Sequence, residues 1–361
     1  LATQGQRQPG SSFKPFILAS ALKAGIGPGS VWPSRKRVFS VPNSPEKFTV
    51  NNFESTYTGA QTLAGGLTFS DNAVYSAVGI KVGTKKVARL ARRMGIRTPI
   101  STNYAMTLGG LREGVTPLDM AHAFETFITH GRRIEGTLGS GSGPVGIDRV
   151  GNDRNEVISK PVLPRGIADQ TVGIMSSVVS QGTGVRAALG DGVFAAGKTG
   201  TTENSGDAWF VGFTERMTVA VWVGYPNKLK PMLTEFQGGP VEGGTFPAII
   251  WHSFMQSANK ILDDRTARER VKKGLPPVDT TTTTSPVPTP PPVPSSPSTV
   301  PEGGAAAPAP TPTTSTPSTP PSTPSAPPTQ STPATPPPSS SGTPTGGGTS
   351  AGGGASAPPS P

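Results

Sequence analysis

Cysteine is absent from the 361-residue sequence, which excludes a disulfide framework and thiol chemistry. No apolar run in this sequence approaches the ~18 residues that a membrane-spanning helix needs, and none has the pattern of a signal peptide. The sequence also lacks a zinc finger, the aromatic set of an RNA-recognition motif and a glycine-rich phosphate loop. These absences give no support to nucleic acid as a partner.

Bulky and charged side chains are almost missing from residues 276–361. This stretch consists largely of Pro, Thr, Ser, Ala and Gly, has no aromatic residue, lysine or arginine, and carries charge only at Asp279 and Glu302. With so little apolar surface to bury, it cannot offset the entropy lost on ordering. We therefore predict a disordered, partly polyproline-II tail over residues 276–361 and one foldable domain over residues 1–275.

Positive charge is concentrated in residues 1–275, which contain all 32 lysines and arginines and 20 of the 22 acidic residues. The resulting net charge of +12 includes basic runs such as residues 34–37 and the pair Lys85-Lys86. Such a surface suits nucleic acid, a membrane surface or an acidic wall glycan. A solvated basic surface without a partner explains the same composition, so the sequence leaves both interpretations open.

Apolar periodicity divides the foldable part into helices followed by strands. Recurrence at three and four residues predicts helices over residues 13–24, 63–79, 84–94, 116–130, 169–179 and 247–261. Alternation predicts three consecutive antiparallel strands over residues 193–202, 207–213 and 218–225, besides a short strand over residues 47–50. This order predicts an α+β fold with helices packed on the faces of an antiparallel sheet.

Four Ser-x-x-Lys pairs are possible nucleophile–base pairs: Ser11/Lys14, Ser20/Lys23, Ser44/Lys47 and Ser257/Lys260. Ser11 and Lys14 share one face of the first helical turn, where free backbone N–H groups favour a developing negative charge. Ser20 faces the opposite way on the same helix. Ser44 lies between two prolines, which disfavours a helix, and Ser257 is expected on a solvated face. Ser11 and Lys14 are therefore the preferred pair.

Two further motifs are informative in combination with Ser11. Ser70-Asp71-Asn72 interrupts the helical pattern of residues 63–79. The alternative to a functional motif is that Ser70 or Asp71 is only a helix N-cap. Lys198-Thr199-Gly200 lies in the first predicted strand, where alternation puts Thr199 and Thr201 on one face and Lys198 on the other. Gly200 leaves room for a ligand backbone. The alternative is an exposed edge strand that carries Lys198 for solubility.

In this order the three motifs form the set found in penicillin-binding proteins and class A β-lactamases. Residues 1–260 resemble the transpeptidase domain of class A (bifunctional) penicillin-binding proteins. The resemblance extends to RQPGSSFKPF, TLAGGLTFSDNAVY, TLGGLREGVTPLDMAHAFETF, AAGKTGTTENSGDAWFVGFT and VAVWVGYP. The segment VEGGTFPAIIW and the Pro/Thr tail are similar to actinobacterial members. The resemblance implies the fold shared by penicillin-binding proteins and serine β-lactamases.

The resemblance also implies roles for individual residues. Ser11 would be the nucleophile and Lys14 its general base. Ser70 would relay a proton to the leaving amine and would be held by Lys198. The remaining substrate-binding positions would be Asn72, Thr199, Gly200 and Thr201, with Asn72 on the donor peptide and the two threonine hydroxyls on its terminal carboxylate. The backbone N–H groups of Ser11 and Thr201 would form the oxyanion hole, and no metal or cofactor is needed.

The implied reaction is attack of Ser11 on the D-Ala-D-Ala bond of a peptidoglycan stem peptide, followed by acyl transfer to the amine of another stem. β-Lactams would acylate the same serine.

The parent protein would be membrane-anchored, act on the extracytoplasmic face, and have cell-wall, divisome or elongasome proteins as possible partners. The alternatives are a β-lactam sensor, a D,D-carboxypeptidase and a β-lactamase; residues 112–117 lack the asparagine of the deacylating loop, which disfavours the last.

The family also places sheet strands, an anchor and a glycosyltransferase domain before the active-site helix. We therefore expect the transpeptidase domain at residues 1–275 to be N-terminally truncated and marginal when isolated. The remaining strands would leave Trp209, Phe213 and Trp222 poorly covered.

Overall fold

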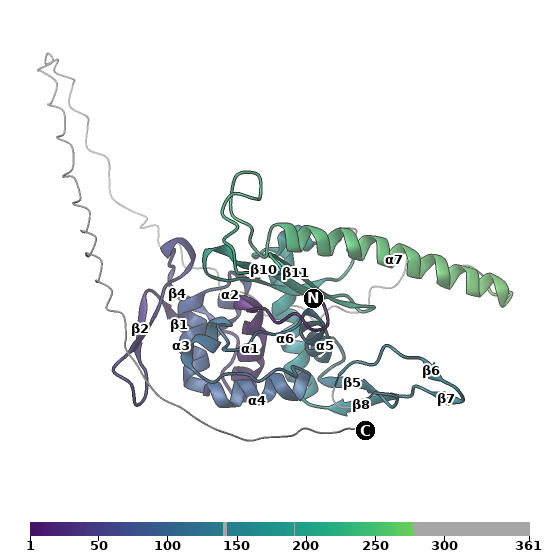
Figure 1. Ribbon diagram of the computed structural model, residues 1–361, viewed down its shortest axis with the longest axis horizontal. Helices are drawn as coiled ribbons and strands as arrows, with labels where there is room; N and C mark the ends of the chain where they lie inside the picture. Colours follow the sequence, from purple (N-terminus) through teal and green to yellow (C-terminus); the bar gives the residue numbers. More distant parts are fainter. Residues whose placement is uncertain (140–142, 191, 277–361) are drawn as a thin grey trace, which may run out of the picture. The chain divides into compact units, whose positions relative to one another are not determined.

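A computed structural model describes residues 1–139, 143–190 and 192–276 (Figure 1). Its central element is α1 (Lys14–Lys23), which follows a 3₁₀ turn at Gly10–Phe13. Nearly every side chain of α1 is buried, as expected for a helix that is apolar on all sides. Pro15 is tolerated because it lies in the first turn, where its missing N–H has no intrahelical role. The helix predicted over residues 13–24 is confirmed, but the predicted tail lies outside the described residues except for Pro276.

Five helices surround α1 or cover the neighbouring sheet. They are α2 (Leu63–Thr68), α3 (Asn72–Val82), α4 (Thr84–Met94), α5 (Pro117–Ile128) and α6 (Arg165–Ser180). The core between α1 and α5 is aromatic, with the ring of Phe16 lying 5.8 Å from Phe124 and 6.0 Å from Phe127. All helices predicted before the strands are present, and the one over residues 63–79 is divided into α2 and α3 at Ser70-Asp71, as expected.

The main sheet contains β9 (Ala196–Thr201), β10 (Asp207–Phe213) and β11 (Thr218–Gly224), in the order β11-β10-β9. Both pairings are antiparallel, as predicted. Helices α5 and α6 pack on one face, and α7 (Phe246–Lys272) contacts β10 and β11 from the other (Figure 1). The α+β prediction is confirmed.

The expectation of poorly covered sheet aromatics is wrong for Trp209 and Phe213, which are fully buried. The segment before the 3₁₀ turn lies against the sheet, and the Trp209 indole donates a hydrogen bond to the Gln8 carbonyl at 2.8 Å. Only Trp222 remains partly exposed, and the Arg7 guanidinium stacks 4.9 Å above its ring. Arg7 and Gln8 thus cover Trp222 and Trp209, which the sequence pattern did not predict.

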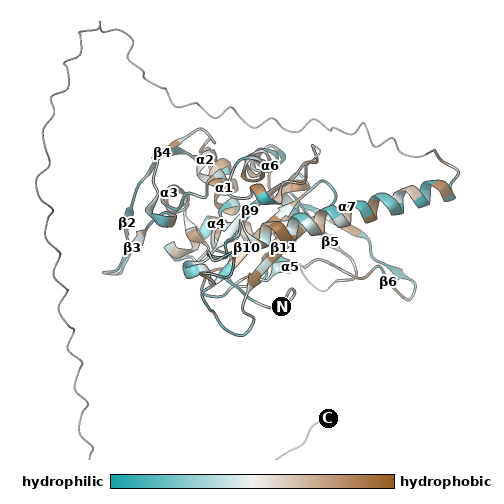
Figure 2. Ribbon diagram, turned by 90° about the horizontal axis from the view of Figure 1, so that it is seen from above, coloured by the Kyte–Doolittle hydropathy of each residue, from teal (hydrophilic) through white to brown (hydrophobic). Residues whose placement is uncertain are grey.

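Short two-stranded sheets form the loops around this body. They pair β1 (Val31–Ser34) with β4 (Gly59–Thr62), β2 (Arg37–Ser40) with β3 (Lys47–Val50), β5 (Arg132–Gly136) with β8 (Val157–Pro161), and β6 (Arg149–Val150) with β7 (Asp153–Arg154). β2, β3 and β6 lie at the periphery of the body in Figure 2. The strand predicted over residues 47–50 is confirmed as β3.

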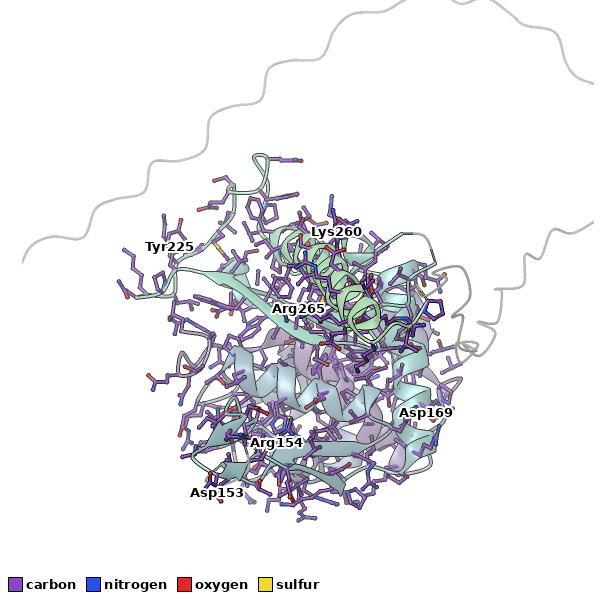
Figure 3. The ribbon with its side chains drawn as sticks, turned by 90° about the vertical axis from the view of Figure 1, so that its right-hand side faces the viewer. Asp153, Arg154, Asp169, Tyr225, Lys260 and Arg265 are labelled. Carbon is purple, nitrogen blue, oxygen red and sulfur yellow. The ribbon has the colours of Figure 1, made fainter. Side chains whose placement is uncertain are left out.

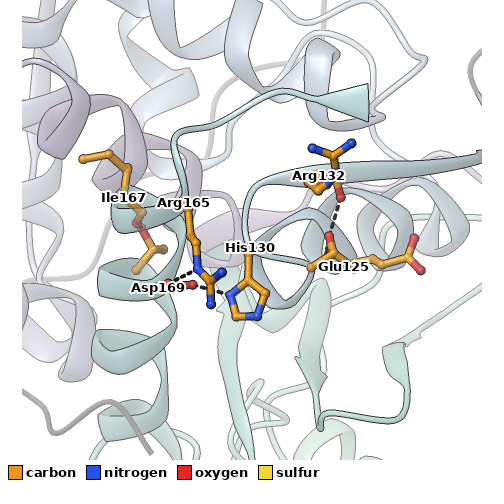
Figure 4. Close-up of polar contacts among 8 residues, drawn as sticks. Glu125, His130, Arg132, Arg165, Ile167 and Asp169 are labelled. Carbon is orange, nitrogen blue, oxygen red and sulfur yellow. Dashed lines mark hydrogen bonds and ion pairs between the residues drawn. The ribbon is translucent and has the colours of Figure 1, made fainter. Parts of the chain in front are cut away.

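A polar clamp holds the end of α5 against the start of α6 (Figure 4). Asp169 of α6 lies 2.6 Å from His130 Nδ1 and accepts a hydrogen bond from Arg165 at 3.3 Å. At the other end of α6, the hydroxyls of Ser177 and Thr68 are 2.7 Å apart. These contacts fix α6 beside β9, one of the strands that carry the site described below.

Helix α7 is longer than the predicted segment, residues 247–261. Its buried residues all lie in its first part: Pro247, Ala248, Trp251 and Met255. Side chains farther along, including Lys260 and Arg265, are exposed (Figure 3). No residue of α7 after Met255 is buried, but helix-forming residues such as Ala267 and Glu269 continue the helix to Lys272. Within the described part of the chain, no helix has the length and apolar character required to cross a bilayer.

Candidate active site

All three motifs meet at one cleft of about 580 Å³. The cleft lies between β9, the α2–α3 turn and the loop before α7. Its lining includes most of the predicted site residues: Ser11, Ser70, Asn72, Thr199 and Thr201. Lys14 and Lys198 lie behind this surface, fully buried. The fold therefore brings together predicted site residues from three separate segments of the sequence.

Ser11 lies in the 3₁₀ turn, and the α-helix itself begins only at Lys14. This turn is pressed against β9. Gly10 has φ +52°, and a β-carbon there would lie 2.6 Å from the Thr201 carbonyl oxygen. Glycine at position 10 thus allows both the left-handed backbone and the close approach that puts Ser11 beside Thr201.

Lys14 is held by the second motif. Its Nζ donates hydrogen bonds to the Ser70 carbonyl and to Asn72 Oδ1, both at 2.7 Å, and a longer one to Ser70 Oγ at 3.3 Å. Burial lowers the pKa of Lys14 to about 7, although the Asp71 carboxylate acts in the opposite direction. Among the described residues, Lys14 Nζ makes no direct hydrogen bond to Ser11 Oγ. A substantial fraction of the amine is neutral near pH 7 and able to accept a proton.

Lys198 approaches the same hydroxyl from the sheet. Its Nζ donates to Ser70 Oγ at 3.0 Å and to both the carbonyl and Oγ1 of Thr199 at 3.1 Å. Burial, with a contribution from the charge of Lys14, holds the pKa of Lys198 well below its usual range. The alternative of an exposed, solubilising lysine is wrong, because no part of Lys198 is accessible to solvent.

The Ser70-Asp71-Asn72 turn both caps α3 and contributes side chains to the cleft. Ser70 has φ +61°, a left-handed conformation that ends α2 and turns the chain. Asp71 is the N-cap of α3, since its Oδ1 accepts a hydrogen bond from the Val74 N–H at 2.8 Å. The N-cap interpretation is thus correct for Asp71, while Ser70 and Asn72 remain free to line the cleft.

Asn52 supports this turn and was not found by sequence analysis. Its Oδ1 accepts hydrogen bonds from the backbone N–H groups of Asn72 and Ala73, each at 2.9 Å. Its Nδ2 donates to Asp71 Oδ2 at 3.0 Å, and the Ser34 hydroxyl reaches the same oxygen at 2.5 Å. Because these contacts link segments far apart in sequence, no local sequence pattern predicts them.

The strand side of the cleft is equally well connected. The Thr199 hydroxyl lies 2.7 Å from that of Thr183, and the Thr201 hydroxyl accepts a hydrogen bond from the Gly243 N–H at 3.1 Å. Thr183 and Glu242 also line the cleft and were not predicted. Glu242 is half-buried, and burial together with the charge of Glu54 raises its pKa.

Gly200 has a different function from the one expected. The space beside it is already occupied, because a β-carbon there would collide with the Pro9 carbonyl and lie 3.0 Å from Ser12. The absence of a side chain lets β9 contact the turn that bears Ser11. Gly200 therefore positions the strand against the turn and does not leave room for a ligand backbone.

Comparison with known proteins agrees with this geometry. Residues 1–250 match the family described as the penicillin binding protein transpeptidase domain. The chain belongs to this family. Penicillin-binding protein 1A from Aquifex aeolicus is 30% identical over 266 residues, and the Neisseria gonorrhoeae protein of the same name is 32% identical over 274 residues. Each alignment covers 72% of this chain but only 34% and 32% of the relatives, so the chain spans about a third of their length.

Solved structures show the same transpeptidase fold. PonA1 from Mycobacterium tuberculosis, in complex with penicillin V, is 26% identical with a TM-score of 0.58, and the match covers 71% of this chain and 70% of PonA1. Penicillin-binding protein 1A from Haemophilus influenzae has a TM-score of 0.60 at 24% identity, covering 71% of this chain and 43% of that structure. The predicted family and fold class are therefore confirmed.

Proposed function

We propose that this transpeptidase domain cross-links peptidoglycan stem peptides through an acyl-enzyme on Ser11. The observation that carries the proposal is the sharing of one hydroxyl, Ser70 Oγ, by two buried lysines beside the cleft that Ser11 lines. Such an arrangement provides a nucleophile, a base of lowered pKa and a proton relay in one place. The penicillin V complex of PonA1 supports β-lactams as ligands of the same cleft.

In the first half-reaction, Ser11 Oγ attacks the carbonyl carbon between the two D-Ala residues. Its proton passes to the neutral form of Lys14, and the tetrahedral oxyanion accepts hydrogen bonds from the backbone N–H groups of Ser11 and Thr201. The C–N bond then breaks, and Ser70 Oγ passes a proton to the departing D-Ala amine. Lys14 reprotonates Ser70 through their hydrogen bond, which leaves a Ser11 ester and a neutral Lys14.

In the second half-reaction, the amine of another stem peptide attacks this ester and forms the cross-link. The proton that the attacking amine loses passes to Lys14, which gives it to Ser11 Oγ as the C–O bond breaks. Asn72 would hold the donor backbone, and the hydroxyls of Thr199 and Thr201 would bind its terminal carboxylate. Lys198 acts as a positioning residue, because it holds both Ser70 Oγ and the Thr199 hydroxyl. None of these steps requires a metal or cofactor.

The second candidate function is hydrolysis of the acyl-enzyme by water, as in a D,D-carboxypeptidase or a β-lactamase. In a β-lactam sensor, the reaction would stop at the acyl-enzyme. Glu242 is the observation that favours hydrolysis, since it is a cleft carboxyl group of raised pKa that can activate water. Product analysis with a stem-peptide donor and an added amine separates transfer from hydrolysis.

We further propose that the domain acts on the extracytoplasmic face as part of a membrane-anchored parent, with wall-synthesis proteins as partners. Residues 276–361 would be a spacer beside the catalytic domain of residues 1–275. Deletion of residues 277–361 is then expected to leave the acylation rate unchanged. A large loss of rate after deletion would show that the tail contributes to the domain.

The test of the active site is covalent labelling of the full 361-residue chain with a fluorescent penicillin. Mass spectrometry is expected to locate the label on Ser11, and Ser11→Ala is expected to abolish labelling. Ser12→Ala is the matched control, because the Ser12 hydroxyl is buried and bonded to the Pro9 carbonyl at 2.7 Å. A label on Ser20 or Ser44, or full labelling of Ser11→Ala, would refute the assignment.

A further inference from the structure

A second cavity, of about 320 Å³, lies at the opposite end of α1 from Ser11. It is formed by the last turn of α1, the end of α3 and one face of α4, and shares no residue with the catalytic cleft. Its lining residues are Ser20, Lys23, Ala24, Val82, Lys86, Arg89, Leu90 and Arg93. Half of them are basic, and none is acidic.

The basic residues of this cavity have exposed side chains and no carboxylate partner in the described part of the chain. Lys86, Arg89 and Arg93 recur at three and four residues, so they share one face of α4. Lys23 joins them from α1, which packs against α4 (Figure 1). No Asp or Glu occurs anywhere in residues 72–112, which include α3 and α4, or in α1. Nothing in these three helices neutralises the four cations.

The floor of the cavity contains an unpaired donor. Ser20 is only 6% exposed, and its hydroxyl is buried without a hydrogen-bond partner among the described residues. A buried hydroxyl that makes no hydrogen bond destabilises the folded protein. In the last turn of α1, the carbonyl groups of Ser20 and Ala21 already accept hydrogen bonds from the N–H groups of Ala24 and Ile26. A ligand oxygen in this cavity would satisfy the Ser20 hydroxyl.

We propose that this cavity binds a phosphate-type oxyanion. The guanidinium groups of Arg89 and Arg93 offer paired N–H donors that match the oxygens of a phosphate. Lys23 and Lys86 add charge at the rim, and Ser20 donates from the floor. A merely solvated basic surface explains neither the concave shape nor the unpaired hydroxyl. The phosphate group can belong to a polyanion in solution or to a lipid headgroup, and the two sources are separated by experiment.

The test measures binding of tripolyphosphate to the full chain by isothermal titration calorimetry. Arg89→Gln is expected to weaken binding about tenfold, because the variant loses a charge-assisted hydrogen bond to the phosphate. Arg92→Gln removes the same charge from the same helix outside the cavity and is expected to change the affinity less than about twofold. Equal losses in the two variants would show diffuse attraction by the basic surface and would overturn the proposal.

Ser20→Ala supplies a second, independent test. Because the hydroxyl has no partner in the part of the chain that the structure describes, its removal is expected to leave the thermal unfolding temperature unchanged or raised. The affinity for tripolyphosphate is nevertheless expected to fall, by about three- to tenfold. Unchanged affinity would remove Ser20 from the site and contradict a ligand seated on the cavity floor.

Vesicles of phosphatidylglycerol and of phosphatidylcholine distinguish the two sources. Binding to phosphatidylglycerol that Arg89→Gln weakens and Arg92→Gln does not would assign the site to a lipid headgroup. Binding of tripolyphosphate alone would assign it to a phosphate-bearing polyanion. No binding of either probe would refute the proposal. Fluorescent penicillin labelling of Ser11 is expected to be unchanged in all three variants, so the result is independent of the proposed function.

Discussion

Lys14 and Lys198 both direct their side-chain amines at the hydroxyl oxygen of Ser70, at 3.3 and 3.0 Å. Two charged amines this close in a buried site repel each other, and burial disfavours the charged form of each. Burial lowers the pKa of Lys14 to about 7, and burial together with the charge of Lys14 holds the pKa of Lys198 well below its usual range. The pair therefore keeps a neutral amine available at neutral pH without any carboxylate base.

The first prediction concerns the pH dependence of acylation. Only neutral Lys14 can accept the Ser11 proton, and its pKa is about 7 because of burial. We expect the rate constant for acylation by a fluorescent penicillin to rise with pH through about 7 and then level off. Stopped-flow or gel-based labelling between about pH 5.5 and 9 measures this profile on both sides of the transition. A flat profile, or one that falls above pH 7, would contradict the role of Lys14.

Lys14→Arg tests the same role by substitution. A guanidinium stays protonated, so we expect a loss of roughly 10²–10⁴ in the acylation rate and disappearance of the transition near pH 7. Lys23→Arg is the matched control, since Lys23 ends the same helix with an exposed side chain. If both variants react equally well, Lys14 is not the base.

The second prediction separates the hydroxyl of Ser70 from its backbone. Because Ser70 has φ +61°, glycine adopts this conformation readily, whereas serine and alanine are both strained by about 1–2 kcal/mol. Both variants lose the hydroxyl, so we expect Ser70→Gly to unfold at a higher temperature than Ser70→Ala. Both variants lose the proton relay, so acylation should slow by about 10²–10⁴. A Ser70→Gly protein that is acylated at a normal rate would exclude the relay.

Much of the fold could be predicted because its signals are local. The three sheet strands and α4 match their predicted ranges closely, since alternation and helical periodicity arise directly from which side chains are buried. The break between α2 and α3 was visible because Ser and Asp disfavour a helix interior and favour a cap. The end of α7 was missed because its second half is not packed against the body.

The site was predictable in its motifs but not in its supports. Ser-x-x-Lys, Ser-Asp-Asn and Lys-Thr-Gly are contiguous, so the sequence contains them whole. Asn52 and Thr183 act through contacts with Asn72 and Thr199, and such pairings exist only once the chain has folded. Gly200 was recognised as special, but whether ligand or protein fills the adjacent space depends on where Pro9 lies.

The third prediction concerns Asn52. Its side chain caps α3 through two backbone N–H groups and binds Asp71, so Asn52→Ala leaves these groups without partners. We expect a loss of about 1–3 kcal/mol in the free energy of unfolding and slower acylation because the Ser70 turn loosens. Chemical denaturation and penicillin labelling measure the two effects.

Asn51→Ala is the matched control for Asn52. The side chain of Asn51 is exposed, and its only hydrogen bond in the described residues is from the Tyr57 hydroxyl at 3.3 Å. We expect a change within about 0.5 kcal/mol and normal acylation. Similar behaviour of the two alanine variants would show that the Asn52 contacts do not stabilise the turn.

The fourth prediction concerns the contact between β9 and the turn that bears Ser11. In Gly200→Ala, the new methyl group would collide with the Pro9 carbonyl and crowd Ser12, so the strand and the turn must separate. Overpacking of this kind costs about 1–3 kcal/mol, and a displacement of ~1 Å at reacting groups can reduce a rate about a hundredfold. Gly166→Ala is the control, because a β-carbon in that first turn of α6 meets no atom within 4 Å. We expect Gly166→Ala to be acylated normally and Gly200→Ala to be slow even at temperatures where circular dichroism shows it fully folded. Normal acylation of folded Gly200→Ala would mean that Ser11 is positioned without this contact.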